Sequence, residues 1–240
     1  MNDSRIQLTV VIPCFNEEAN LVELVNELKD QMMITPFQVF LVDNGSTDNT
    51  QNKLKEILAG LPRSTSENIK VMNLPKNLNY GGGIKAGIRE CETEYVGWFH
   101  ADLQIEAKEI SKLILGLKPG VTLIKGLRKS RPITERLFTG GMSLIASILF
   151  QSHLKDINGQ PTIYRRSFLE QYSVSPDDFL IDAFFYINAT KNRCEISRFP
   201  VLMKSRKHGE SSWNRGLKSQ LKFSLITVKS LWKMRVRNYA

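Results

Sequence analysis

The 240-residue sequence has few cysteines, no long apolar run and no internal repeat, and each absence narrows the class of protein. Its three cysteines, Cys14, Cys91 and Cys194, are widely spaced and form neither a disulfide framework nor a zinc pattern. The longest apolar stretch, residues 140–150, is shorter than the ~20 residues of a membrane-spanning helix, and the N-terminus lacks the features of a signal peptide. We therefore expect a protein of a reducing compartment, the cytoplasm, without a transmembrane helix.

Collagen-like, low-complexity and disordered classes are excluded by the composition, with 42% hydrophobic and 24% charged residues. The length allows one large domain or two small ones. Because no flexible linker interrupts the chain, we expect a single domain over residues 1–216, followed by a helix within residues 217–240.

The net charge of +9 is concentrated at the C-terminal end. Ten Lys and Arg lie between Lys204 and Ala240 against the single acid Glu210, whereas the first 203 residues are neutral overall. Such a distribution indicates an anionic partner that is met by the C-terminal segment.

A helix drawn over residues 217–236 has a basic face next to an apolar face. The basic face holds Lys218, Lys222, Lys229 and Lys233, and the apolar stripe holds Leu217, Leu221, Leu225, Val228 and Trp232. This pattern is typical of a helix lying in a membrane interface, here at an anionic inner surface. Packing of the apolar stripe on the domain, with the Lys side chains in solvent, is the alternative.

Strand-like and helix-like patterns alternate over the first hundred residues. The expected strands are residues 8–13, 37–42, 69–74 and 95–99. After the first strand, Leu21, Leu24 and Leu28 lie on one helical stripe, and we expect Asn16 to cap that helix. The alternation predicts an α/β fold with a doubly wound, mostly parallel sheet and helices on both faces, with ligand groups gathered after the carboxyl ends of the strands.

The alternation is looser beyond residue 105. We expect a helix through Ile110, Leu113 and Leu117, a strand over residues 121–126, an apolar helix over 138–150 and a strand near 199–203.

Polar motifs follow three of the strands, and each has a plain alternative. VDNGSTDNT is also a common strand-to-helix turn, and NYGGGIKAG lacks the spacing of a dinucleotide fingerprint. In HADLQ, an extended segment places Asp102 and Gln104 on one face beside His100. Oxygen ligands at this spacing suit a hard divalent cation, and a capped turn is the alternative.

The order of the motifs resembles the family-2 glycosyltransferases of GT-A fold. PCFNEEAN, VDNGSTDNT, NLNYGGGIKAG and HADLQ occur in that family's order. DINGQPTIYRR and RKHGESS are similar to two later segments of the polyprenyl- and dolichol-phosphate sugar synthase type, to which the resemblance is closest. It covers residues 8–216.

The resemblance implies the following residues for nucleotide binding: Pro13, Asn16, Glu17, Asp43, Gly45, Ser46, Asp102 and Arg206. It also implies Mg²⁺ or Mn²⁺ on Asp102 and Gln104. The family usually has Asp at the position of His100, so a softer ligand stands here and one charge is lost. We keep His100 as a metal ligand in this prediction.

The implied reaction is an inverting, metal-assisted sugar transfer from a nucleotide-diphosphate sugar. A saccharide hydroxyl as acceptor needs a general base, for which Asp182 is the candidate, whereas an ionised lipid phosphate needs none. The alternative for Asp182 is a helix cap or a polar partner near the core. Arg128, Arg131 and Arg136 are candidates for the acceptor phosphate, with a solvated basic loop as their alternative.

Two other functions remain open at this point. A protein that binds a nucleotide sugar with weak or no turnover is consistent with His100. A basic nucleic-acid-binding protein would explain the charged tail, but no aromatic-rich RNA signature or basic recognition helix precedes it.

Overall fold

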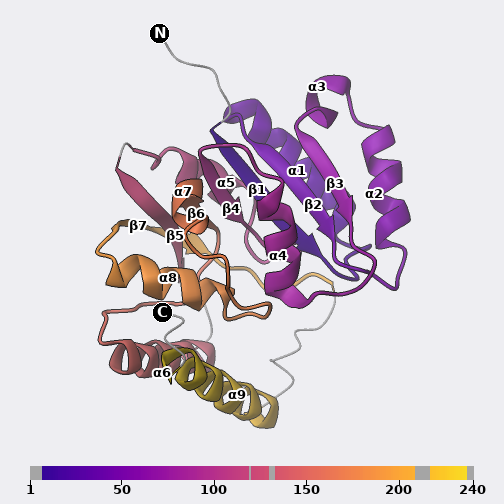
Figure 1. Cartoon of the computed structure of the whole chain (residues 1–240). Helices are drawn as coiled ribbons and strands as arrows, with labels where there is room; N and C mark the ends of the chain where they lie inside the picture. The colour runs from indigo at the N-terminus through magenta and orange to yellow at the C-terminus, as the bar shows by residue number, and fades with distance from the viewer. Residues whose placement is uncertain (1–6, 119, 130–132, 209–216, 237–240) are drawn as a thin grey trace.

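The computed structural model describes residues 7–118, 120–129, 133–208 and 217–236, which form one α/β domain (Figure 1). The strands of these residues are β1 (Leu8–Cys14), β2 (Gln38–Asp43), β3 (Ile69–Asn73), β4 (Tyr95–Trp98), β5 (Val121–Lys129), β6 (Thr162–Arg165) and β7 (Glu195–Leu202). The helices are α1 (Leu21–Ile34), α2 (Thr50–Ala59), α3 (Arg63–Ser66), α4 (Asn79–Arg89), α5 (Lys108–Ile114), α6 (Ile133–Phe150), α7 (Arg166–Leu169), α8 (Ile181–Lys191) and α9 (Leu217–Val236).

The strands form one sheet in the order β3-β2-β1-β4-β6-β5-β7. β1 pairs in parallel with β2 and β4, and β5 pairs in parallel with β7. β6 is antiparallel to both of its neighbours, β4 and β5. The sheet is therefore mostly parallel, and the carboxyl ends of β1, β2 and β4 lie along one edge.

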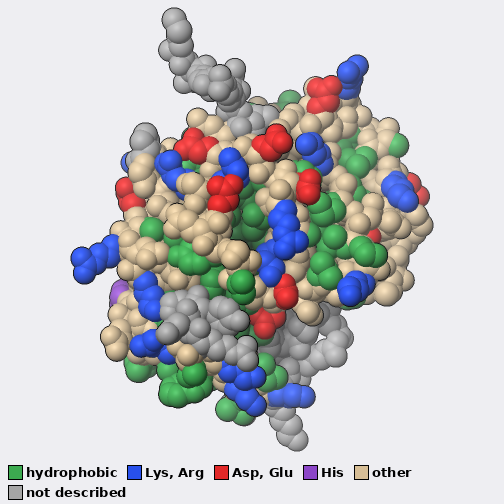
Figure 2. Space-filling view, in the orientation of Figure 1, with side chains coloured by type: hydrophobic (Ala, Val, Ile, Leu, Met, Phe, Trp, Pro, Cys, Tyr) green, Lys and Arg blue, Asp and Glu red, His purple; other side chains and the backbone are tan. Residues whose placement is uncertain are grey.

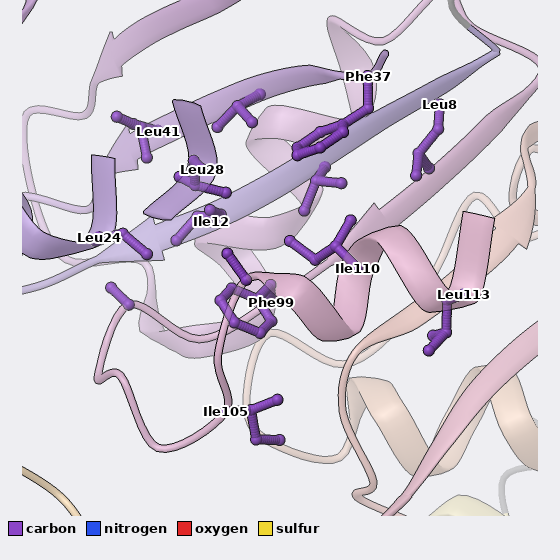
Figure 3. Packing of buried hydrophobic residues seen from close by; sticks show 14 of the residues in the cluster. Leu8, Ile12, Leu24, Leu28, Phe37, Leu41, Phe99, Ile105, Ile110 and Leu113 are labelled. Atoms are coloured by element: carbon purple, nitrogen blue, oxygen red, sulfur yellow. The ribbon is translucent and has the colours of Figure 1, made fainter. Parts of the chain in front are cut away.

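Two hydrophobic clusters cover the two faces of the sheet. Alternate residues of β1 divide between them, since Val10 and Ile12 join one cluster and Val11 joins the other. The first cluster lies against α1 and α5, as Figure 3 shows for Leu24, Leu28 and neighbouring residues. The second cluster includes residues of α4, α6, α8 and α9. Both faces are buried, as expected for a doubly wound sheet.

The first four strands and the helices between them confirm the sequence prediction, with one correction. Asn16 does not cap α1, because the helix begins at Leu21, and Asn20 at its N-terminus makes no side-chain capping bond. Asn16 has a positive φ of 57° and lies in the preceding turn. Asn tolerates this conformation because its short polar side chain bonds to nearby backbone.

Three elements of the second half were not predicted, namely β6, α7 and α8. β6 is only four residues long, and α8 is buried on all sides from Ile181 to Ala189. A helix that is apolar all round has no amphipathic period, so hydrophobic spacing does not reveal it. The expected helix through Leu117 ends earlier, at Ile114.

Helices α6 and α9 pack against each other at the bottom of the molecule in Figure 1. The helix expected over residues 217–236 is present as α9. None of the helices in the part of the chain that the structure describes combines the length and apolar character needed to cross a bilayer.

Candidate active site

The turns that follow β1 and β2 are hydrogen-bonded to each other. The backbone N–H of Asn16 donates to Ser46 Oγ at 3.0 Å, and the side-chain Oδ1 of Asn16 accepts the Thr47 N–H at 2.8 Å. The backbone N–H of Glu17 donates to Thr50 Oγ1 at 2.9 Å. The first two sequence motifs therefore form one polar surface at the carboxyl edge of the sheet.

Asp43 and Gly45 shape the second of these turns. Asp43 is 3% exposed, and its Oδ1 accepts the Ser46 N–H at 3.0 Å. Gly45 has a φ of +71°, and a Cβ atom there would lie 2.3 Å from the carbonyl carbon of Lys76, so the turn requires glycine. Pro13 lies in β1, paired with β2. Asp43, expected to bind a nucleotide base, thus holds the turn that would lie beneath the base.

Arg206 pairs with Asp102, directly after β4. Arg206 Nη2 donates to Asp102 Oδ2 at 2.7 Å, and Asp102 is only 6% exposed. Burial raises the pKa of Glu17, the negative charge of Asp102 raises it further, and the Arg206 charge lowers it. The three residues are therefore close enough for their charges to interact, and the guanidinium offsets the repulsion between the two acids.

The HADLQ segment is bent rather than extended. Leu103 has a φ of 57°, and Asp102 Oδ1 accepts the backbone N–H of Gln104 at 3.1 Å. The prediction of an extended segment is wrong, because an Asp side chain that bonds two residues ahead stabilises a turn. The Gln104 amide donates to the Lys204 carbonyl at 3.4 Å. The His100 ring stacks on the ring of Tyr80.

Asp102 can serve as one carboxylate ligand of a divalent cation. Within the described ranges, no group of three or more His, Cys, Asp or Glu side chains is placed to hold a metal. Mg²⁺ is usually held by one or two carboxylates together with phosphate oxygens and water. Asp102, with Glu17 nearby, fits that smaller protein contribution, and Arg206 is the counter-ion of this carboxylate here.

Asp182 lies in the first turn of α8 and is 3% exposed. Its Oδ1 accepts hydrogen bonds from Trp98 Nε1 at 2.8 Å and from Gln160 Nε2 at 3.0 Å. The same Gln160 amide donates to the Tyr80 hydroxyl at 2.9 Å. Asp182 is not the helix cap, which is Leu180, and it is bound as a polar partner within the core. The role of Asp182 as a general base stays a prediction.

Lys125 is a fully buried cation that the sequence analysis missed. Its Nζ donates to the Gly159 carbonyl at 2.7 Å. Burial lowers the pKa of Lys125 to about 8, and the negative charge of Asp182 acts in the opposite direction. A lysine within the apolar run VTLIKG indicates a buried lysine with a specific polar partner, because burying an ammonium group without a partner costs much free energy. Tyr80 and Gln160, also missed, carry no comparable signal.

Arg128 and Arg136 line one pocket of about 530 Å³ between the end of β5 and α6. Arg128 is part of β5 and binds Asp156 through Nε at 3.1 Å and Nη2 at 2.6 Å. It is therefore not in a solvated loop. Asp156 and His153 also line the pocket. Arg131, the third candidate, lies outside the described residues.

Helix α9 buries a different stripe from the one expected. Thr227, Leu231 and Met234 are buried, whereas Leu225 and Trp232 of the expected stripe are 72% and 58% exposed. The reason is that α9 packs on α6 through this side, where Leu231 and Met234 join the second hydrophobic cluster. Lys222, Lys229 and Lys233 are exposed. The side chains of Leu217, Lys218 and Leu221 lie outside the described part.

The mostly parallel sheet, with its polar turns gathered at one edge, defines an enzyme of the GT-A glycosyltransferase class. The structure of glucosyl-3-phosphoglycerate synthase from Mycobacterium tuberculosis, in complex with Mn²⁺, UDP and glucosyl-3-phosphoglycerate, superposes with a TM-score of 0.68 at 16% identity. The match covers 96% of this chain and 80% of that one. A Pyrobaculum calidifontis mannosyltransferase in complex with GDP-Man and Mn²⁺ gives 0.68 at 17% identity, covering 94% and 64%.

The Glycosyl transferase family 2 model matches residues 9–175, and the chain belongs to this family. Among curated relatives, the undecaprenyl-phosphate 4-deoxy-4-formamido-L-arabinose transferase of Pseudomonas fluorescens is 27% identical, over 95% of this chain and 67% of that protein. The Aeromonas hydrophila protein of the same name is 26% identical, over 98% and 72%. The chain thus spans about two thirds of the length of these relatives.

Proposed function

We propose that this enzyme transfers a sugar, with inversion, from a nucleotide-diphosphate sugar to a polyprenyl phosphate. The observation that carries the proposal is the Arg206–Asp102 pair at the carboxyl edge of the sheet, beside the joined turns after β1 and β2. The relatives named as undecaprenyl-phosphate transferases support the acceptor class.

The donor side has to stabilise charge on the leaving diphosphate. Arg206 has a planar guanidinium that suits paired bonds to phosphate oxygens. Asp102 would hold Mg²⁺ or Mn²⁺, which supplies further positive charge beside the diphosphate when bound. The Mn²⁺ in the two solved structures supports this cofactor. The Asp102 carboxylate holds Arg206 at this edge of the sheet.

The acceptor side has two residues suited to an anion. Arg128 and Arg136 both line the pocket at the end of β5, where an acceptor phosphate would bind. Arg128 forms an ion pair with Asp156. An acceptor phosphate would therefore bind Arg128 either beside this carboxylate or in its place. A lipid phosphate is already ionised and needs no general base, whereas a saccharide acceptor would depend on Asp182.

An anionic membrane surface is the partner we propose for α6 and α9. More than half of the large hydrophobic side chains that the described residues expose lie on these two helices. These side chains are Ile133, Leu137, Leu144, Ile148, Leu225, Ile226, Trp232 and Val236. Hydrophobic and basic side chains gather at the lower edge of Figure 2, where α6 and α9 lie in Figure 1. This surface would place the protein peripherally on the inner face of the membrane.

A donor screen tests the function. UDP-, GDP- and dTDP-sugars are incubated with undecaprenyl phosphate, with and without Mn²⁺, and both lipid-linked product and free nucleotide diphosphate are measured. Product formation that depends on donor, acceptor and metal supports the proposal. Tight nucleotide-sugar binding without turnover would instead support a binding protein, which His100 in place of a carboxylate favours. Salt-dependent oligonucleotide binding alone would support a nucleic-acid-binding protein.

A further inference from the structure

The rings of Tyr80 and His100 form a stacked pair between the two candidate carboxylates. Their centroids are 5.1 Å apart and their planes differ by 21°. His100 lies two residues before Asp102, and the Tyr80 hydroxyl is joined through the Gln160 amide to Asp182. The pair is therefore linked to Asp102 along the chain and to Asp182 by hydrogen bonds through Gln160.

Tyr80 is held firmly in this position. It lies in the first turn of α4, whose start is fixed by Asn44, which donates to the Asn79 carbonyl at 2.9 Å and accepts the Leu78 N–H at 3.0 Å. Burial raises the pKa of Tyr80 well above its ordinary value, and the negative charges of Asp182 and then Asp102 add to this.

We infer that the Tyr80–His100 pair is the wall against which the donor sugar rests, and that it sets which sugar is accepted. The inference rests on the proposed function, because a sugar that leaves a diphosphate near Arg206 for an acceptor phosphate near Arg128 must lie between these two residues. Both residues are half-buried, so part of the pair remains accessible. Aromatic faces pack against the apolar face of a sugar ring, and the polar atoms of the pair select its substituents.

The imidazole of His100 has a definite consequence for selectivity. It carries no negative charge, whereas Asp102 and Asp182 on either side are acids. A carboxylate at position 100 would repel a sugar that bears its own carboxylate, by about tenfold in affinity for charges separated by several ångströms of partly wet protein. The wild-type pair is therefore more tolerant of anionic sugars than a variant with Asp at this position.

Binding measurements test the inference without an acceptor. Calorimetry gives the affinities of UDP, UDP-glucose, UDP-galactose and UDP-glucuronate, or of the GDP or dTDP series if the wild type binds that base. For His100→Asp we expect UDP-glucuronate to weaken about tenfold relative to UDP-glucose. Tyr80→Phe removes the phenolic oxygen. We expect it to change the ratio of the affinities for UDP-glucose and UDP-galactose about fivefold. The affinity for UDP alone should stay within about twofold in Tyr80→Phe, and the His100→Asp result is taken only from the ratio between the two sugars.

The matched control is Tyr172→Phe. The Tyr172 hydroxyl accepts an amide hydrogen bond from Asn192 at 2.8 Å, as that of Tyr80 does from Gln160. Of these two amides, Gln160 is the one that also donates to Asp182. For Tyr172→Phe, the ratios between the affinities for the nucleotide sugars should equal those of the wild type. Unchanged ratios in His100→Asp and Tyr80→Phe, with normal wild-type donor binding, would refute this inference alone. A wild type that binds no nucleotide sugar would refute the proposed function as well.

Discussion

Arg206 donates a 2.7 Å hydrogen bond to Asp102 across 104 residues of sequence. The bond joins the segment after β7 to the turn after β4, which are separated in the chain by most of the second half of the domain. Because Asp102 is buried and acidic, the guanidinium serves as its counter-charge. An incoming cation would compete for this carboxylate, and the released Arg206 would be free to bind the diphosphate.

Asp102→Asn should lower turnover by ~100-fold or more, because it removes the carboxylate that holds Arg206 and that would hold the metal. Metal-dependent nucleotide binding, measured by calorimetry with and without Mn²⁺, should be lost together with it. Asp30→Asn, an exposed carboxylate on α1, is the control and should leave both unchanged. Full activity of Asp102→Asn would exclude the metal assignment.

Asp182→Asn distinguishes the two acceptor classes. With a saccharide hydroxyl as acceptor, the loss of a general base should lower kcat by ~10²–10⁴-fold. With undecaprenyl phosphate the effect should be small, since Asn keeps an oxygen that accepts from Trp98 and Gln160. The measurement is kcat with each acceptor, with the unfolding midpoint as a control for folding. Equal losses with both acceptors would show that Asp182 is structural.

Lys125→Met should change how stability depends on pH. Burial lowers the pKa of Lys125 to about 8 in the folded protein from its ordinary value of 10.5. Between these values the unfolded chain binds a proton that the folded protein does not, so the wild type gains stability as pH rises. Relative to Lys125→Met, the free energy of unfolding of the wild type should rise by up to ~1.4 kcal/mol per pH unit between pH 8 and 10.5. Below this window the difference between the two proteins should not depend on pH. Urea unfolding of both proteins from pH 7 to 10.5 measures it, and parallel curves would contradict the assignment.

Binding to anionic liposomes should depend on the lysines of α9. Each Lys near an anionic surface contributes ~1 kcal/mol, so changing Lys222, Lys229 and Lys233 to Gln should weaken binding by ~100-fold. Co-sedimentation at low and high salt measures this effect, and binding should fall with salt.

The control for the liposome experiment changes three exposed lysines elsewhere, Lys55, Lys76 and Lys118, to Gln. It alters the net charge equally but leaves α9 intact. If both triple variants lose the same affinity, only net charge matters. If the wild type ignores anionic liposomes at low salt, the membrane proposal is wrong.

Much of the first half of the fold was predictable because its signals are local. The buried strands have β-branched runs, and α1 has a 3.6-residue apolar period in Leu21, Leu24 and Leu28, so each element can be found from its own sequence. The turns at Asp43 and Gly45 are likewise set by short polar and glycine residues. The order of the motifs by itself indicates the family.

Only the tertiary structure decided which groups meet. The bend at Leu103, the all-round burial of α8 and the burial of Lys125 depend on neighbours that are distant in sequence. The same holds for the stacking of His100 on Tyr80 and for the packing of α9 on α6, which leaves Trp232 exposed. The sequence determined the strands, the turns and the chemistry of their side chains, because these follow from local sterics and hydrophobic period. Pairings between residues far apart in the chain were decided by the packing of complete elements, which no local pattern encodes.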